Sequence, residues 1–159
     1  YAGEKSDAVK KSALEWVDVN HAVFDDAALA IHGFAETELK EYKSSACLAD
    51  LLERNGFSVE RGAAGLPTAF VAVYGSGKPV IGFLAEYDAL PNIGHACHHH
   101  IIASASVNTA IALSKLGSDL YGKIVCMGTP AEELMDAKGM MIKNGAFKGI
   151  DAALMAGEF

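Results

Sequence analysis

The sequence lacks the marks of several protein classes. Its longest apolar run, residues 79–85, falls far short of the ~20 residues that a membrane-spanning helix needs. No basic segment leading into an apolar one opens the chain, so no signal peptide is predicted. Cysteine is scarce, and Cys47, Cys97 and Cys126 show no paired spacing. We therefore expect a reduced, cytoplasmic location rather than a disulfide scaffold, and no membrane partner.

A basic stripe is absent too. Thirteen Lys and Arg against twenty Asp and Glu give a net charge of −7, which argues against nucleic acid as a partner. No Gly-x-Ser-x-Gly elbow supports a serine hydrolase. The glycines at residues 75–77 do not form a phosphate loop, because no Lys-Ser/Thr pair opens a helix after them.

Over its 159 residues, the sequence alternates between apolar residues at helical spacing and apolar residues in strand-like runs. Helical spacing predicts helices over residues 4–31, 38–54, 100–116 and 131–145. Strand patterns occupy residues 57–61, 69–74, 80–86, 123–128 and 151–155, with a turn at 75–77. We expect an α/β fold, a mostly parallel mixed sheet flanked by helices on both faces.

In such sheets, ligands bind beyond the carboxyl ends of the strands. Residues 86–88 follow one buried strand and residues 128–133 follow the next one. A His- and Cys-rich segment, residues 94–100, lies between the first of these and a small-residue helix. The residues able to bind a metal or to catalyse a reaction should therefore meet at one edge of the sheet.

The segment GHACHHH at residues 94–100 is the densest chemical feature. Cys97 and His99 lie two residues apart before a predicted helix, and thiolate and imidazole are common zinc ligands. A surface loop with incidental histidines, or a buried inert Cys97, is the alternative. Adventitious nickel or zinc binding is also expected of so many histidines. His21 and His32, in the first predicted helix, have no evident partner and are expected to be ordinary core or surface residues.

Two acidic motifs accompany this segment. Glu132 and Glu133 are adjacent, so one can ligate a metal while the other takes a proton from water. The alternative is an ordinary helix N-terminus, where acidic residues meet the helix dipole favourably. Asp88 can orient a histidine ligand, or it can be a turn aspartate ahead of Pro91.

Together, three ordered motifs resemble the dinuclear metal-dependent amidohydrolase and aminoacylase family. They are AEYDALP at residues 85–91, GHAC-x-H at residues 94–99 and GTPAEE at residues 128–133. The Glu-Tyr-Asp version is most similar to the aminobenzoyl-glutamate hydrolase and dipeptidase branch. This resemblance implies hydrolysis of an amide bond in an N-acyl amino acid, an aminobenzoyl-glutamate-like compound or a dipeptide.

The resemblance also implies roles for individual residues. Cys97, His99 and Glu133 would be metal ligands, Glu132 the general base, and Asp88 a support for a ligand. The family uses two divalent ions, zinc or manganese, and we expect one ion or none here. Its members act on small-molecule amides and form homodimers at full length.

Other expectations follow from departures from the family pattern. His98 replaces a glycine, His100 replaces an asparagine or aspartate, and Gly157 stands where the family has a histidine ligand. Residues 1–159 should be the N-terminal segment of the catalytic domain, without the lid and dimerisation domain or the C-terminal catalytic segment. A non-catalytic or truncated homologue that binds a metal or a partner chain without turnover is the alternative, and we expect no useful turnover by this chain alone.

Overall fold

The computed structural model of the chain describes residues 2–157. Within them the α-helices are α1 (Ala2–Phe34), α2 (Tyr42–Arg54), α3 (His99–Ser114) and α4 (Ala137–Lys143). Short 3-10 helices are η1 (Ala63–Gly65) and η2 (Gly117–Asp119). The strands are β1 (Ser58–Arg61), β2 (Phe70–Ser76), β3 (Val80–Ala85), β4 (Gly122–Gly128) and β5 (Ala152–Leu154).

The strands form one mixed sheet in the order β1-β2-β4-β3-β5. Strand β3 pairs in parallel with β4 and β5, whereas β2 is antiparallel to both β1 and β4. Four strands therefore share one direction and β2 alone runs against them. The predicted mostly parallel mixed sheet is confirmed, and its central strands are buried, as near-continuous apolar strands should be.

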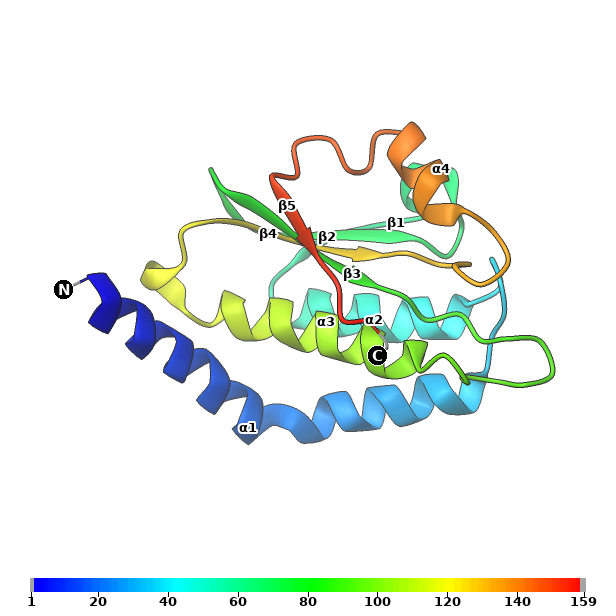
Figure 1. Cartoon of the computed structure of the whole chain (residues 1–159), viewed down its shortest axis with the longest axis horizontal. Helices are drawn as coiled ribbons and strands as arrows, with labels where there is room; N and C mark the ends of the chain where they lie inside the picture. The colour runs from blue at the N-terminus through cyan, green and yellow to red at the C-terminus, as the bar shows by residue number, and fades with distance from the viewer. Residues whose placement is uncertain (1, 158–159) are drawn as a thin grey trace.

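Helices cover both faces of the sheet (Figure 1): α1, α2 and α3 lie on one side and α4 on the other. Helix α3 packs against the sheet through small and branched side chains, including Ala103, Val107 and Ala110. Its buried hydroxyls are satisfied, because Ser104 donates to the Phe24 carbonyl of α1 at 2.7 Å and Ser106 to the Leu84 carbonyl of β3 at 2.6 Å. Because its side chains are small and its buried hydroxyls are hydrogen-bonded, α3 can lie close to the sheet, as predicted.

Three predicted boundaries were wrong. Helix α2 begins at Tyr42 rather than residue 38, because Leu39 adopts a φ of 51° that no α-helix allows. The turn expected at residues 75–77 comes later, since Gly75 and Ser76 still pair with β4.

The third error concerns the segment before α4, expected to be helical from residue 131. Ala131 has a φ of 53°, and the segment up to Asp136 forms turns. Helix α4 starts only at Ala137, where the Asp136 side chain accepts a hydrogen bond from the Gly139 amide at 2.9 Å. Glu132 and Glu133 therefore precede the helix, and the alternative interpretation of them as helix N-terminal acids is wrong.

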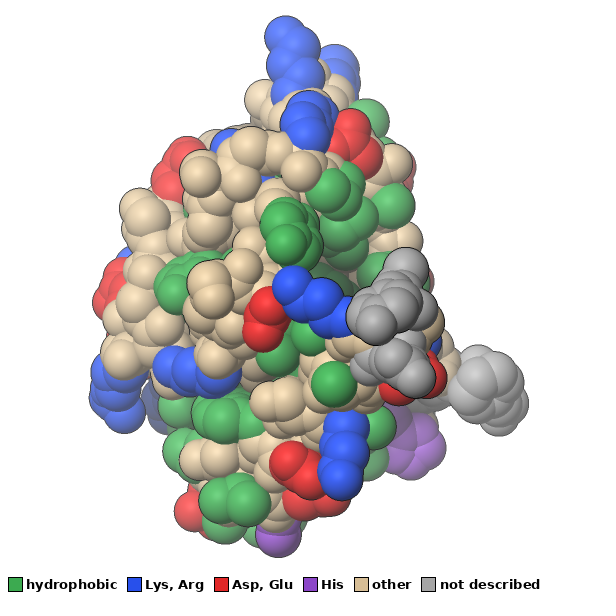
Figure 2. Space-filling view, turned by 90° about the vertical axis from the view of Figure 1, so that its left-hand side faces the viewer, with side chains coloured by type: hydrophobic (Ala, Val, Ile, Leu, Met, Phe, Trp, Pro, Cys, Tyr) green, Lys and Arg blue, Asp and Glu red, His purple; other side chains and the backbone are tan. Residues whose placement is uncertain are grey.

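Charge is dispersed on the face that Figure 2 shows, where Lys and Arg side chains lie at several separate places among acidic, apolar and polar groups. This pattern agrees with the absence of a basic stripe in the sequence. Within residues 2–157, no helix has both the length and the apolar character needed to cross a membrane.

Candidate metal centre

The site lies at one edge of the sheet, where β3 and β4 end together. Their parallel register pairs Ala85 with Gly128, so the segments that begin at Glu86 and Thr129 leave the sheet side by side. The Thr129 amide continues the pairing by donating to the Ala85 carbonyl at 2.8 Å. The edge predicted from the sequence therefore does bring the two acidic motifs together.

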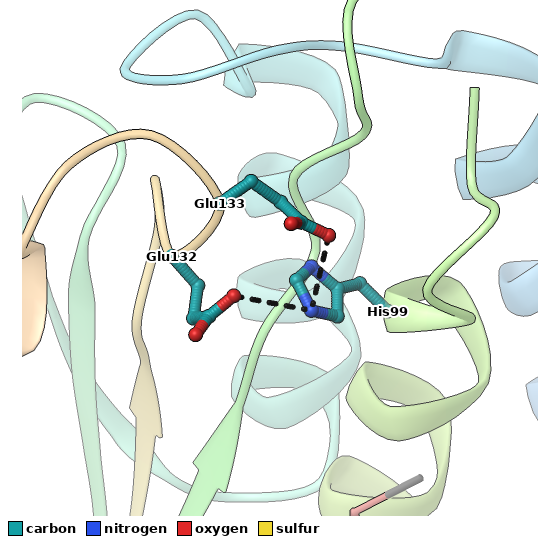
Figure 3. Close-up of side chains that lie close together, drawn as sticks. All are labelled: His99, Glu132 and Glu133. Carbon is teal, nitrogen blue, oxygen red and sulfur yellow. Dashed lines mark ion pairs between the residues drawn. The ribbon is translucent and has the colours of Figure 1, made fainter. Parts of the chain in front are cut away.

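His99, the first residue of α3, points toward the two glutamates of the turn after β4 (Figure 3). Its Nε2 atom lies 3.8 Å from Glu132 Oε2 and 3.8 Å from Glu133 Oε1. One ligand atom from each of the three residues lies within 4.8 Å of the others, and no other such group of His, Cys, Asp or Glu occurs in residues 2–157. One imidazole nitrogen and two carboxylates can hold a single divalent ion.

Asp88 contacts two members of this group. Its buried side chain lies 3.0 Å from His99 Nδ1 through Oδ1, and its Oδ2 accepts a hydrogen bond from the Glu133 amide at 3.0 Å. Burial alone would raise the pKa of Asp88, but these hydrogen bonds outweigh it and lower that pKa. Asp88 thus has the position expected of a residue that orients a histidine ligand.

The contact with Asp88 also determines the protonation state of His99. Burial alone would lower the pKa of His99, but the hydrogen bond and charge of Asp88, and the charge of Glu86, raise it to about 9. Without a metal, His99 is therefore protonated near neutral pH. A bound cation would replace the Nε2 proton, since a ligating imidazole must be neutral there.

Glu86 is a member of the site that sequence reasoning did not select, although it opens a motif. Its buried side chain places Oε2 3.3 Å from His99 Nε2, and its Oε1 forms an ion pair with Lys138 of α4. The signal available was its position directly after β3. Its cationic partner, Lys138, lies on α4, which covers the face of the sheet opposite α3. The sequence does not indicate that α4 comes close to Glu86.

Glu41 is a second missed residue, and it acts further from the ligand atoms. It is fully buried, and it accepts hydrogen bonds from the Ala131 amide at 3.0 Å and the Thr68 hydroxyl at 2.7 Å. Burial raises the pKa of Glu41. Through Ala131, Glu41 fixes the start of the turn that carries Glu132 and Glu133.

Cys97 and His98 form the turn that leads into α3. Cys97 is half-buried and lies outside the group formed by His99, Glu132 and Glu133, so its role as a ligand stays a prediction. His98 adopts a left-handed conformation, with φ 57° and ψ 22°. Only glycine takes this conformation without strain, which gives a physical reason for the glycine in the family pattern.

Gly157 lies three residues beyond Leu154, the last residue of β5. Because β5 is parallel to β3, it leaves the sheet at the same edge as Glu86. Among residues 2–157, a Cβ atom added to Gly157 would meet no heavy atom within 4 Å, and the φ of Gly157 lies outside the glycine-only region. A side chain fits there, but glycine supplies no ligand.

Comparisons with known proteins place these motifs among hydrolases. A subunit of the p-aminobenzoyl-glutamate hydrolase of Escherichia coli (strain K12) is 34% identical over 158 residues, covering 87% of this chain and 33% of that protein. The Xaa-Arg dipeptidase of Mus musculus is 41% identical over 103 residues, covering 58% of this chain and 24% of that protein. No protein-family model matches the chain. The chain spans a third or less of the length of these two relatives.

A solved structure has the same fold. It is that of a Bacillus subtilis protein described as a dinuclear metal binding peptidase from the M20 family. The TM-score is 0.71 at 22% identity, and the match covers 84% of this chain and 43% of that one. The α/β fold predicted from the sequence is thus also that of a known metallopeptidase.

Proposed function

The chain is a homologue of the aminobenzoyl-glutamate hydrolase and dipeptidase branch of the metal-dependent amidohydrolases, and from this premise we propose that it carries the general base and a metal site for amide hydrolysis. The observation that carries the proposal is the convergence of His99, Glu132 and Glu133, with Asp88 bonded to the opposite nitrogen of the histidine ring. A carboxylate behind a ligating histidine is the usual way of fixing its orientation.

The two glutamates suit different tasks. The Glu133 side chain is 15% exposed and its amide is tied to Asp88, so it suits a fixed ligand. The Glu132 side chain is 42% exposed, so it can reach the water and the substrate. We assign Cys97, His99 and Glu133 to one divalent ion, zinc or manganese.

A bound divalent ion supplies Lewis-acid chemistry, because it polarises the amide carbonyl and makes water more acidic. Glu132 takes a proton from the attacking water as the new C–O bond forms. It returns that proton to the amine nitrogen as the C–N bond breaks. Asp88 keeps His99 Nδ1 protonated and leaves Nε2 for the cation.

The substrate is a small amide: an N-acyl amino acid, an aminobenzoyl-glutamate-like compound or a dipeptide. A cavity of about 370 Å³ opens beside Glu132 and is lined further by Leu134, Met135, Asp136 and Lys138. The chain would be the N-terminal segment of the catalytic domain, and the homodimer and the cytoplasmic location stay predictions.

The test is release of aminobenzoate from aminobenzoyl-glutamate by the natural gene product that contains this chain. We expect Glu132→Gln to lower kcat by about 10²- to 10⁴-fold, the usual contribution of a general base. Metal content should stay the same, because Glu132 is assigned no ligand role. Glu60→Gln, an exposed change on β1, is the matched control. A Glu132→Gln enzyme with unchanged kcat would contradict the proposal.

A second candidate function is metal binding without turnover, and Gly157 is the observation that favours it. A Cβ atom at this position would meet no described atom within 4 Å, and β5 leaves the sheet at the right edge, yet glycine supplies no donor. If this hypothesis holds, Glu132→Gln has no rate to lower, and Gly157→His tightens zinc binding in calorimetry.

A further inference from the structure

A cluster of three imidazoles lies behind the site just described, on the side of α3 that faces α1. His32 belongs to the last turns of α1, His95 precedes α3, and His100 is its second residue. The ring centroids of His32 and His100 are 4.9 Å apart, those of His95 and His100 are 5.0 Å apart, and those of His32 and His95 are 6.1 Å apart. The expectation that His32 has no partner was therefore wrong.

The protonation of His95 follows from its one hydrogen bond. Its Nε2 lies 3.1 Å from the carbonyl oxygen of Ile31, and a carbonyl can only accept, so Nε2 carries the proton. In the neutral ring Nδ1 then carries a lone pair, and this atom is buried without a hydrogen-bond partner. A backbone carbonyl on the far nitrogen is a common support for a metal-ligating histidine.

His100 resembles His95 in one respect: its Nδ1 is also buried without a hydrogen-bond partner. Buried polar atoms without partners are rare in folded proteins and call for a physical reason. The two nitrogens belong to rings that are neighbours, with centroids 5.0 Å apart. With the proton of neutral His100 on Nε2, a cation that accepts both Nδ1 lone pairs would satisfy the two atoms together.

The spacing of the rings fits a shared ion. With metal–nitrogen bonds of about 2.0–2.1 Å and tetrahedral angles, imidazole centroids lie about 5 Å apart. Two of the three separations match this value and the third is about 1 Å longer. His32 is exposed, so rotation of its side chain can close the remaining gap at little cost.

We propose that His32, His95 and His100 form a second, all-imidazole site for a borderline divalent ion, separate from the carboxylate site at His99. Imidazole ligands without carboxylates favour nickel, copper and zinc over magnesium, calcium and manganese. Unlike His99, Glu132 and Glu133, the three rings need a side-chain rotation before their nitrogens converge. The two sites use different sides of one helix start, so loss of one leaves the other in place.

The test is calorimetric titration of the whole chain with NiCl₂ as the probe. The change His32→Ala removes one ring from an exposed position. Loss of a residue that only supports a histidine ligand lowers metal affinity by about 10- to 100-fold, so we expect loss of the ligand itself to lower nickel affinity by at least that much. The change His100→Asn should have a similar effect. The matched control is His21→Ala, an exposed histidine of the same helix that bonds to Asp25, and its affinity should stay that of the parent.

A second measurement separates the two sites. In crystals soaked with nickel, an anomalous peak should lie between the rings of His32, His95 and His100, and it should vanish in His32→Ala. A peak that appears only beside His99, or nickel affinity unchanged in both His32→Ala and His100→Asn, would overturn the proposal. Neither result would affect the assignment of Glu132 as the general base.

Discussion

His99 and His100 are neighbours in the chain, yet they lie in opposite chemical surroundings. His99 meets the carboxylates of Glu86, Asp88, Glu132 and Glu133. His100 meets the imidazoles of His32, His95 and His98. Successive residues of a helix point about 100° apart, so one helix start can serve both regions.

The contrast shows in the acidity of the two rings. Carboxylate contacts outweigh burial and raise the pKa of His99 to about 9. Burial, together with the neighbouring imidazoles, lowers the pKa of His100 to about 4. The carboxylate region is thus built for a cation or a proton, whereas the imidazole region keeps the His100 ring neutral. Changes at Asp88, His100, Lys138 and His98 should affect the two regions differently.

The largest effect should come from Asp88→Ala, which removes the carboxylate that both His99 and Glu133 contact. Loss of one partner from a buried ion pair costs about 3–5 kcal/mol of unfolding free energy. Urea denaturation of the metal-free chain measures this cost. The exposed Asp26→Ala on α1 is the control, expected within about 0.5 kcal/mol of the parent. A cost for Asp88→Ala no greater than that of the control would remove the basis for the contrast.

The pH dependence of stability should have two limbs in the metal-free chain. Above the unfolded histidine pKa of 6.5, folded His99 holds a proton that the unfolded state has lost, so stability falls as pH rises toward 9. Below pH 6.5, His100 is protonated in the unfolded state but stays neutral in the folded state, so stability falls as pH drops toward 4. Denaturation at a series of pH values should therefore show a maximum near 6.5.

A variant separates the limbs. His100→Asn should make the acid limb shallower, with the remainder due to His95, whose pKa burial also lowers, and should leave the alkaline limb unchanged. If stability instead rises steadily from pH 5 to pH 9, the assignment of His99 as the proton-holding residue fails.

A smaller effect should follow from Lys138→Met, which takes the cationic partner from buried Glu86. Because the Lys138 side chain is 26% exposed, the loss should be limited to about 1.5–3 kcal/mol, the range for a hydrogen bond to a charged group. Thermal unfolding compares it with Lys143→Met, an exposed change on the same helix. Equal melting temperatures for the two variants would mean that Glu86 does not depend on Lys138.

The smallest effect should come from His98→Gly, at the left-handed residue that separates the two regions. Relief of the left-handed strain, about 1–2 kcal/mol, is partly offset by the greater freedom of glycine in the unfolded chain. We expect a net gain of about 0.5–1 kcal/mol in the urea-derived free energy of unfolding. A loss would show that the His98 side chain stabilises the turn more than its backbone strains it.

The sequence predicted the sheet and its functional edge well, because both depend on local signals. Apolar strands such as Val80–Ala85 are evident from their composition, and parallel strands deliver the residues that follow them to one edge. The prediction failed at Ala131, where a buried hydrogen bond from its amide to Glu41, ninety positions away in the chain, outweighs local helix propensity.

Long-range contacts also account for the residues that were missed. Glu41 and Lys138 reach the site from segments that no motif links to it. His32 gains its neighbours only because α1 packs along α3 (Figure 1). Such groupings depend on how helices lie against one another, which hydrophobic periodicity does not determine.

Anomalous scattering from crystals of the chain grown with zinc tests directly whether His99 and Glu133 bind a metal. A peak about 2.0–2.2 Å from His99 Nε2 and from a Glu133 carboxylate oxygen is the expected result, with the distances typical of zinc. No peak at His99, with zinc confined to His32, His95 and His100 or absent altogether, would contradict the assignment of the carboxylate region as the metal centre.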